Sequence, residues 1–263
     1  MRAGSAAGLT DAQAKAAAAG QKGMMPLQGA DGRARPFLDF LLSAIADAGY
    51  REVILVVAPV SADGPDPMRE YYTGIGRPSR LSIQFAVQQE ARGTADALVA
   101  ASEAIGARGF VVLNADNLYG VDTLRALRLA DGPALPVYER GDLVRSSGIP
   151  DERVAAFALL EVTNDGLLRD IVEKPGAERM REVGDHALIS MNAWRGDARI
   201  LQACREVPIS SRGEFELPAA IRLAIAHGVA IRAVPASGPV FDLSRPEDVP
   251  WVMAALGQRQ VQP

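Results

Sequence analysis

Short runs rich in Val, Ile and Leu alternate along the chain with longer segments whose apolar residues recur at helical spacing. This alternation is typical of helices packed against a mainly parallel sheet, so it predicts a Rossmann-like α/β fold. In the first half the pattern predicts a helix at 37–45 capped by Gly49, strands at 52–58, 81–87 and 110–113, and a helix at 94–105. Ligands of such sheets bind at the carboxyl ends of the strands.

The chain beyond residue 133 has a different rhythm, which favours a more antiparallel half. Strand-like runs lie at 134–138, 154–162, 167–173 and 187–192, with a hairpin signal at Asn164-Asp165-Gly166. The remaining segments are predicted as a helix at 214–226, a strand pair across 229–241 and a closing helix from Pro246.

Composition restricts the class of protein. The 263 residues are 48% hydrophobic and 23% charged, which is typical of a packed globular protein. The longest apolar stretch, 53–60, is interrupted by Pro59 and is far shorter than the roughly 18 residues of a membrane helix. The net charge is −4 and the arginines are scattered, so neither a membrane nor a nucleic acid is expected as a partner.

Cysteine and histidine are too scarce for several kinds of chemistry. Cys204 is a lone cysteine and cannot form an internal disulfide, which fits a reducing compartment. The Ala-rich first twenty residues lack the continuous apolar core of a secretory signal, so we expect a cytoplasmic protein. Because the histidines are only His186 and His227, any metal would have to be bound by carboxylates.

Lysine is rare in this sequence, which uses arginine for ordinary surface charge. It occurs only at positions 15, 22 and 174. Lys22 opens Lys22-Gly23-Met24-Met25-Pro26-Leu27, and Lys174 lies in Glu173-Lys174-Pro175 at a strand end. Both suit a compact charge directed at a phosphate, although solvated surface lysines would look the same.

Two further segments place polar groups at the ends of predicted strands. Gln88-Gln89-Glu90-Ala91-Arg92-Gly93-Thr94 offers an amide that can both donate to and accept from a pyrimidine edge, and a glycine that allows close backbone approach to a flat ligand. Gly-Thr before a helix is also an ordinary turn and cap.

Asp116 and Asp242 each follow an apolar run. A carboxylate at such a strand end suits a Mg²⁺ ion, but it could equally belong to a turn or cap a helix.

Taken in order, these segments resemble the sugar-1-phosphate nucleotidylyltransferases, which join a nucleoside triphosphate to a sugar phosphate. The resemblance runs from Gln21 to Asp248 and includes Ser211-Arg212-Gly213-Glu214-Phe215-Glu216-Leu217, which is similar to the family's Arg-Gly-Glu-x-Glu segment. It implies one nucleotidyltransferase domain over 1–263, with a nucleotide-binding half at 21–132, a sugar-phosphate-binding half at 133–248 and an Ala-rich N-terminal segment at 1–20.

The resemblance also implies a role for each candidate residue. It assigns Lys22, Lys174 and Asp116 to catalysis on the phosphates, Gln88, Gly93 and Thr94 to the nucleotide, Glu173, Ser190 and Asn192 to the sugar, and Asp116 with Asp242 to a Mg²⁺ ion. The implied partners are a nucleoside triphosphate and a sugar phosphate. The sequence is compatible with a homo-oligomer but does not specify one.

The sequence departs from the family pattern in two places. Members begin with a strand and a loop of the form Gly-x-Gly-x-Arg, whereas Met1-Arg2 matches the residues just after that loop, and Gly4 to Gly8 resembles it only superficially. Without that strand, a doubly wound sheet is expected to keep two open inner edges or to close around the gap. In the sugar pocket, Ser190-Met191-Asn192 replaces a common Gly-x-Tyr, which leaves the sugar open.

The leading hypothesis is therefore an enzyme in which a sugar-phosphate oxygen attacks the α-phosphorus and pyrophosphate leaves. Positioning and charge neutralisation are sufficient for such a reaction, without a nucleophilic side chain. The alternative is a catalytically silent sugar-nucleotide-binding protein of the same fold, which the loss of the loop favours. An NAD-dependent oxidoreductase ranks third, because no G-x-G-x-x-G follows a strand.

Overall fold

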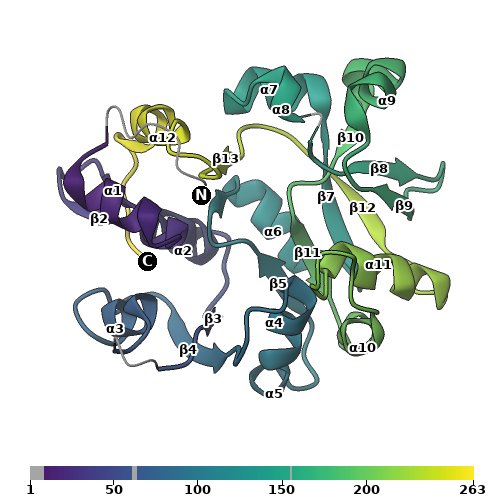
Figure 1. Cartoon of the computed structure of the whole chain (residues 1–263). Coiled ribbons are helices and arrows are strands. Elements are labelled where there is room, and N and C mark those ends of the chain that lie inside the picture. Colours follow the sequence, from purple (N-terminus) through teal and green to yellow (C-terminus); the bar gives the residue numbers. More distant parts are fainter. Residues whose placement is uncertain (1–8, 61–63, 155) are drawn as a thin grey trace.

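Helices and strands are mixed along the whole chain in the computed structural model, which describes residues 9–60, 64–154 and 156–263 (Figure 1). The predicted α/β class is confirmed. The main sheet contains, in spatial order, β5 (Phe110–Leu113), β11 (Ala193–Gly196), β7 (Ala134–Glu139), β10 (Leu188–Ile189), β8 (Leu159–Val162) and β9 (Leu168–Val172), and β12 (Arg232–Ala236) pairs with β7.

Three smaller strand pairs complete the sheet structure. They are β1 (Pro26–Gln28) with β2 (Ala34–Pro36), β3 (Glu52–Val57) with β4 (Ser82–Val87), and β6 (Asn117–Leu118) with β13 (Phe241–Asp242). Met1-Arg2 and Gly4 to Gly8, which bear on the expected missing strand, lie outside the described residues.

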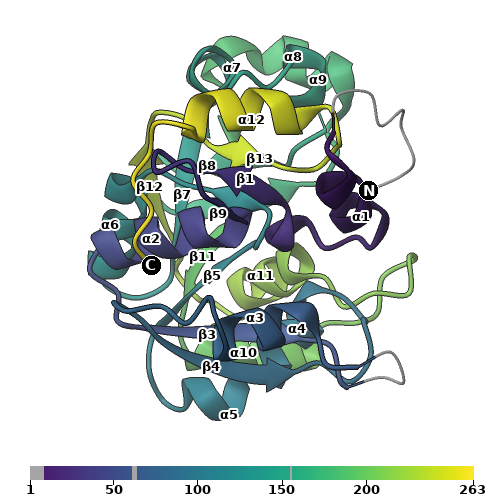
Figure 2. The ribbon, with the colours of Figure 1, turned by 90° about the vertical axis from the view of Figure 1, so that its left-hand side faces the viewer.

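The helices cover the sheets on several sides (Figures 1 and 2). They are α1 (Asp11–Ala18), α2 (Phe37–Asp47), α3 (Pro67–Thr73), α4 (Thr94–Ala100), α5 (Ser102–Ile105), α6 (Val121–Leu129), α7 (Arg140–Ser147), α8 (Asp151–Val154), α9 (Gly176–Val183), α10 (Ala198–Glu206), α11 (Leu217–Ala226) and α12 (Asp248–Leu256), with short 3-10 turns at Lys22–Met24 and Gly184–His186. Helix α6 packs on β7, β11 and β12, and α10 packs on α4 and α11. None of the helices in these described ranges is both long and apolar enough to cross a membrane.

Most of the strand pairings are antiparallel, contrary to the expected mainly parallel sheet. In the described ranges, β3 pairs with β4 and β7 with β12 in parallel, and the other pairings between strands are antiparallel. Strands β10 and β11 both run antiparallel to β7, separated only by residues 190–192. Strand β11 also pairs with β5, so it lies antiparallel between β5 and β7.

Several predicted segments differ from the observed elements. The helix expected at 94–105 is two helices, α4 and α5, on either side of Ala101, and the strand expected at 154–162 begins only at Leu159 because residues 151–154 form α8. The predicted strand at 187–192 is reduced to β10. The expected strand pair across 229–241 does not form, because β12 pairs with β7 and β13 with β6. The hairpin at 164–166 is confirmed by the antiparallel pairing of β8 and β9.

Among the residues that the structure describes, strands β3 and β5 each lie at the edge of a sheet. Strand β3 pairs only with β4, and β5 pairs only with β11, among the residues that the structure describes. Figures 1 and 2 both place the β3–β4 pair apart from the main sheet, below β5 and near α4.

Candidate active site

Asp116 and Asp242 are brought together by the short β6–β13 pair. Asp116 lies in the turn between β5 and β6, and Asp242 is the register partner of Asn117, the first residue of β6. The backbone N–H of Leu243 donates to the Asp116 carbonyl at 3.0 Å. The two acids therefore come from adjacent segments that are far apart in the sequence.

Lys22 contacts one member of this pair, Asp116. Its Nζ donates to Oδ2 of Asp116 at 2.8 Å, and both side chains are largely shielded from solvent. The neighbouring Gly23 is buried, and a Cβ there would lie only 3.2 Å from the Ala115 carbonyl oxygen. The short 3-10 turn can lie so close to the Asp116 loop because residue 23 has no side chain.

Asp242 is buried and is held by a second cation. Arg153 Nη2 donates to its Oδ2 at 2.9 Å, and the Ser244 hydroxyl donates to its carboxylate at 2.6 Å. Burial raises the pKa of Asp242 and the Asp116 charge raises it further, against the opposing effects of Ser244 and Arg153. Arg153 also pairs with Asp248 of α12, so the guanidinium is shared between two acids.

The donor set of this acid pair fits a hard divalent cation. Within the described residues, no group of three or more His, Cys, Asp and Glu side chains could hold a metal ion. Among these residues the site therefore offers two carboxylates at most, and the other ligands would have to be phosphate oxygens or water. This is the manner in which Mg²⁺ is commonly bound.

A cavity of about 420 Å³ borders Asp242 on the side of α8 and α12. Its lining includes Asp242, Arg153, Arg245 and Trp251. The acid pair is thus next to an open space with two guanidinium groups, which suits anionic groups of a ligand.

Tyr119 connects the acid pair with residues 190–192. Its hydroxyl donates to the Met191 carbonyl at 2.7 Å and approaches the Asn192 carbonyl at 3.3 Å. Ser190 is buried, and its hydroxyl accepts from the Asn192 N–H at 3.3 Å. Asn192 has a positive φ of 57°, a conformation that asparagine tolerates better than most residues. The Ser190 hydroxyl is therefore engaged in the turn itself.

Gln88 and Gly93 form the loop between β4 and α4. The Gln88 Nε2 donates to the Gly93 carbonyl at 3.0 Å and to Oδ2 of Asp96 at 2.9 Å. Gly93 has φ 106°, and a Cβ there would clash with the backbone of Phe215, whose N lies 2.9 Å from that position. The close approach expected of this glycine is thus made to the protein's own backbone.

Residues 92–95 are joined to the segment before α11. The Phe215 N–H donates to the Arg92 carbonyl at 2.7 Å, and its carbonyl accepts from the Ala95 N–H at 2.9 Å. The Thr94 hydroxyl accepts from the N–H of Leu217, the first residue of α11, at 2.9 Å. Thr94 therefore caps a helix other than the one it begins.

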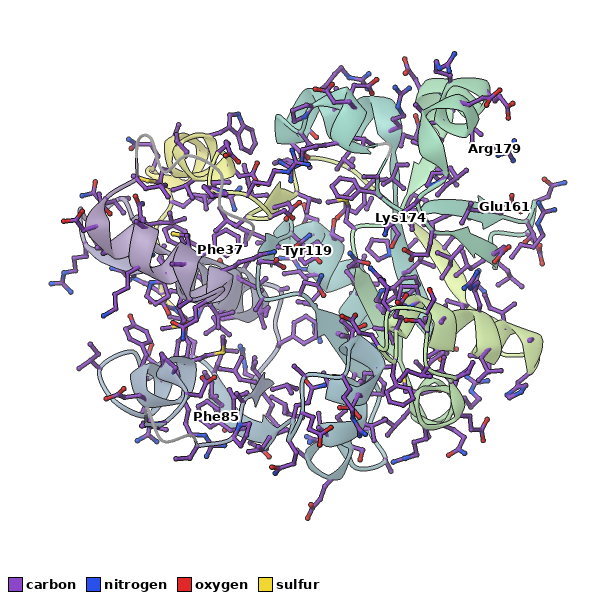
Figure 3. The ribbon with its side chains drawn as sticks, viewed as in Figure 1. Phe37, Phe85, Tyr119, Glu161, Lys174 and Arg179 are labelled. Atoms are coloured by element: carbon purple, nitrogen blue, oxygen red, sulfur yellow. The ribbon has the colours of Figure 1, made fainter. Side chains whose placement is uncertain are left out.

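Glu173 and Lys174 directly follow β9, and Glu173 lies near Glu216 and Arg212 of the segment before α11. Partial burial raises the pKa of Glu173, and the nearby Glu216 raises it further, against Arg212, Arg222 and Lys174. Arg212 donates to Glu216 at 2.9 Å. Lys174 has a φ of 48°, a strained value for a lysine. In Figure 3, Lys174 lies between Tyr119 and the hairpin that carries Glu161.

The candidate residues thus form two groups. One contains Lys22, Asp116 and Asp242, joined to Asn192 through Tyr119, and the other contains Glu173 and Lys174 with Arg212 and Glu216. The loop of Gln88, Gly93 and Thr94 contacts the second group's segment through Phe215 and Leu217. Among the described residues, no hydrogen bond or ion pair directly connects Lys174 with Asp116.

Sequence reasoning missed three residues that shape the site: Arg153, Tyr119 and Asp96. Arg153 lies in the four-residue helix α8, which has no periodic pattern to mark it. Tyr119 follows a two-residue strand and reads as an ordinary core aromatic. Asp96 lies eight residues after Gln88, on the far side of a turn. This separation is the signal in the sequence that the two side chains could meet.

Comparison with known proteins gives a consistent result. A family profile described as "Nucleotidyl transferase" matches residues 21–236. The UTP–glucose-1-phosphate uridylyltransferase of Haloferax volcanii is 26% identical over 240 residues, which cover 86% of this chain and 84% of that protein. A glucose-1-phosphate thymidylyltransferase of Streptomyces antibioticus is 28% identical over 78% of this chain, which spans 52% of that relative's length.

Solved structures share the fold. A UDP-glucose pyrophosphorylase complexed with UDP-glucose has a TM-score of 0.65 at 17% identity, with 89% of each chain covered. HddC from Yersinia pseudotuberculosis, complexed with GMP-PN, has a TM-score of 0.61 at 20% identity and covers 89% of each chain. The resemblance stated from the sequence motifs is confirmed.

Proposed function

Because the chain belongs to the nucleotidyl transferase family, we propose that it transfers a nucleoside monophosphate from a pyrimidine nucleoside triphosphate to a hexose 1-phosphate, with release of pyrophosphate. Two relatives are named as glucose-1-phosphate uridylyl- and thymidylyltransferases, which supports glucose 1-phosphate as the acceptor. The observation that carries the proposal is the contact of Lys22 with Asp116, which the β6–β13 pairing brings next to Asp242.

In this proposal the reaction is an in-line displacement. An oxygen of the sugar phosphate attacks the α-phosphorus of the triphosphate, the new P–O bond forms, and the bond to pyrophosphate breaks. No side chain has to act as a nucleophile, so the residues bind, orient and neutralise charge.

The acid pair and Lys22 are assigned to the triphosphate. Asp116 and Asp242 would hold a Mg²⁺ ion, which when bound neutralises phosphate charge. Lys22 lies within 2.8 Å of Asp116, so its ammonium is positioned to move from that carboxylate to a phosphate oxygen when the substrate binds. Arg153 orients Asp242 through its hydrogen bond and favours its charged form against the effect of burial.

Lys174 and Glu173 are assigned to the sugar phosphate. The exposed Lys174 would bind the phosphate, and Glu173 would accept from a sugar hydroxyl. Asn192 is the remaining candidate for a second sugar contact, since the Ser190 hydroxyl is engaged in the turn. Gln88 is assigned to the pyrimidine base, and Gly93 and Thr94 shape its loop.

A catalytically silent nucleotide-sugar-binding protein is the second candidate. One observation favours it: both acids are already paired with cations of the protein, Asp116 with Lys22 and Asp242 with Arg153. Such a protein would bind the product without forming it. We place either activity in the cytoplasm, where nucleoside triphosphates are available and where a lone buried Cys204 stays reduced.

The test is pyrophosphate release from UTP or dTTP, with and without glucose 1-phosphate, in the presence of Mg²⁺. The proposed function predicts release that requires both substrates and that is abolished in Lys22→Ala. Arg33→Ala is the matched control, because this exposed arginine lies outside both groups of candidate residues. Binding of UDP-glucose without any pyrophosphate release would instead support the silent binder.

A further inference from the structure

The amide of Gln88 is held in one orientation by two acceptors. Its Nε2 lies 3.0 Å from the Gly93 carbonyl oxygen and 2.9 Å from Oδ2 of Asp96. A carbonyl and an ionised carboxylate can only accept hydrogen bonds, so the amide atom that faces both must be the NH₂ group. The identity of this atom therefore follows from its neighbours.

The carbonyl oxygen of the same amide is left free. In the described ranges, Oε1 of Gln88 accepts no hydrogen bond. It is not a buried orphan either, because the buried side-chain polar atoms without a partner in these ranges are only Nε of Arg35 and Nε of Arg140. Gln88 is partly exposed, so its Oε1 is accessible. The side chain consequently presents a ligand with an acceptor, although glutamine in general carries both an acceptor and donors.

We infer that Asp96 is a positioning residue that makes Gln88 select a base carrying a ring N–H. This inference rests on the proposed function, which assigns Gln88 to the base. Uracil and thymine have an N–H at ring position 3, whereas cytosine has a bare nitrogen acceptor there. An acceptor opposite that edge therefore binds uracil or thymine and meets only another acceptor in cytosine.

Asp96 contributes more to this orientation than Gly93. A charged acceptor forms a stronger hydrogen bond than a neutral carbonyl, and a flipped amide would place Oε1 against the carboxylate. Asp96 is itself fixed, because Arg92 donates to its other oxygen at 3.0 Å and the side chain is only 17% exposed. Loss of the carboxylate should let the amide turn and present its NH₂ group instead.

The experiment compares kcat/KM for UTP with kcat/KM for CTP, with glucose 1-phosphate as the second substrate. In Asp96→Ala the UTP-to-CTP ratio should fall about tenfold, which corresponds to about 1.4 kcal/mol. The value for CTP itself should rise, because a turned amide donates to the cytosine ring nitrogen. A ratio is independent of the fraction of folded enzyme, so partial unfolding would not imitate this result.

Four further variants separate positioning from a general structural effect. Arg92→Ala removes the ion pair of Asp96 but leaves the carboxylate on Gln88, so the ratio should stay near that of the unchanged chain. Asp96→Asn keeps an acceptor oxygen and should retain most of the preference. In Gln88→Ala the preference should be lost, and adding Asp96→Ala should change it no further.

The outcomes distinguish this inference from the proposed function. A normal preference for UTP that persists in Asp96→Ala would overturn the role of Asp96 while leaving the function intact. Equal loss of the preference in Arg92→Ala would overturn it too, because the ion pair and not the Gln88 contact would then be responsible. If the unchanged chain neither turns over nor binds UTP, the proposed function fails and the inference fails with it.

Discussion

Each acid at the centre of the candidate site is neutralised by a cation from another part of the chain. Asp116 is paired with Lys22, and Asp242 with Arg153. A buried carboxylate is costly unless it is paired, and the raised pKa of Asp242 reflects that cost. At the residue scale, the proposed function explains why two costly carboxylates are kept together here: they would bind a ligand rather than stabilise the fold.

Asp242→Asn tests this separation of function from stability. The variant removes one of the two carboxylates, so turnover should fall roughly 100-fold. The melting temperature should change little, because burial already disfavours the charge and Arg153 keeps Asp248 as a partner. Turnover and thermal melting are measured on the same preparation. Asp248→Asn is the control and should keep its activity; unchanged turnover in Asp242→Asn would remove this residue from the site.

Gly93→Ala tests the close contact between the Gln88 loop and Phe215. The new Cβ meets the Phe215 backbone, in addition to backbone strain at φ 106° and ψ 176°. Gly184→Ala is a matched control, since φ 76° and ψ −158° lie in a similar region and its Cβ would meet nothing within 4 Å. In urea denaturation Gly93→Ala should lose about 1–3 kcal/mol more than Gly184→Ala. Equal losses would contradict the contact.

Asp39 gives a pH-dependent prediction outside the site. It is buried, and accepts hydrogen bonds from Tyr72 at 2.8 Å and Tyr71 at 3.2 Å. Burial raises its pKa despite these bonds and the charge of Arg35. The folded state therefore holds a proton more tightly than the unfolded state, and stability decreases as pH rises from the ordinary carboxyl pKa of 3.8 through the raised value.

In Asp39→Asn this contribution to the pH dependence disappears. The difference in unfolding free energy between the variant and the unchanged chain should therefore shift in favour of the variant as pH rises through that window. Urea denaturation of both proteins at a series of pH values from about 4 upward measures it. A constant difference at all pH values would show that Asp39 does not titrate in the folded protein in this window.

At the scale of elements, the β3–β4 pair is a two-stranded parallel pair separate from the main sheet. Two-stranded pairs are marginal by themselves, and this pair depends on its contact with α4 and on apolar side chains such as Leu55 and Val57 in the core. Strand β7, by contrast, has β12 on one edge and β10 with β11 on the other.

Hydrogen exchange measures this difference directly. Amides of β3 and β4 should exchange through openings of lower free energy than amides of β7, because fewer strand–strand contacts have to be broken to expose them. Mass spectrometry of peptides that cover 52–57, 82–87 and 134–139 reads it out. If β3 is as well protected as β7, its open edge is covered by another strand in solution.

The pattern of the sequence predicted elements well where apolar periodicity was long. Helix α2 and strands β3, β4, β5 and β7 lie where the pattern placed them. It failed for short elements such as β6 and β13, because two residues carry no periodicity. The same limit explains why periodicity could not predict the contact of Lys22 with Asp116, and why Arg153 was missed.

At the scale of the whole molecule, distant segments close on one another. Strand β5 of the expected nucleotide-binding half pairs with β11 of the expected sugar-binding half, and β13 returns to β6. The Gln262 N–H donates to the Ser43 hydroxyl at 3.1 Å, so the end of the described chain contacts α2. We infer that the two halves form one domain, in which the site lies where they meet.

In the proposed reaction, a sugar-phosphate oxygen attacks the α-phosphorus of a pyrimidine nucleoside triphosphate. The most direct measurement uses glucose 1-phosphate labelled with oxygen-18 in its phosphate, together with unlabelled UTP, Mg²⁺ and the 263-residue chain. Mass spectrometry of the products should find all of the label in the nucleotide sugar and none in the pyrophosphate. Label in the pyrophosphate, or no nucleotide sugar at all although both substrates bind, would contradict the claim.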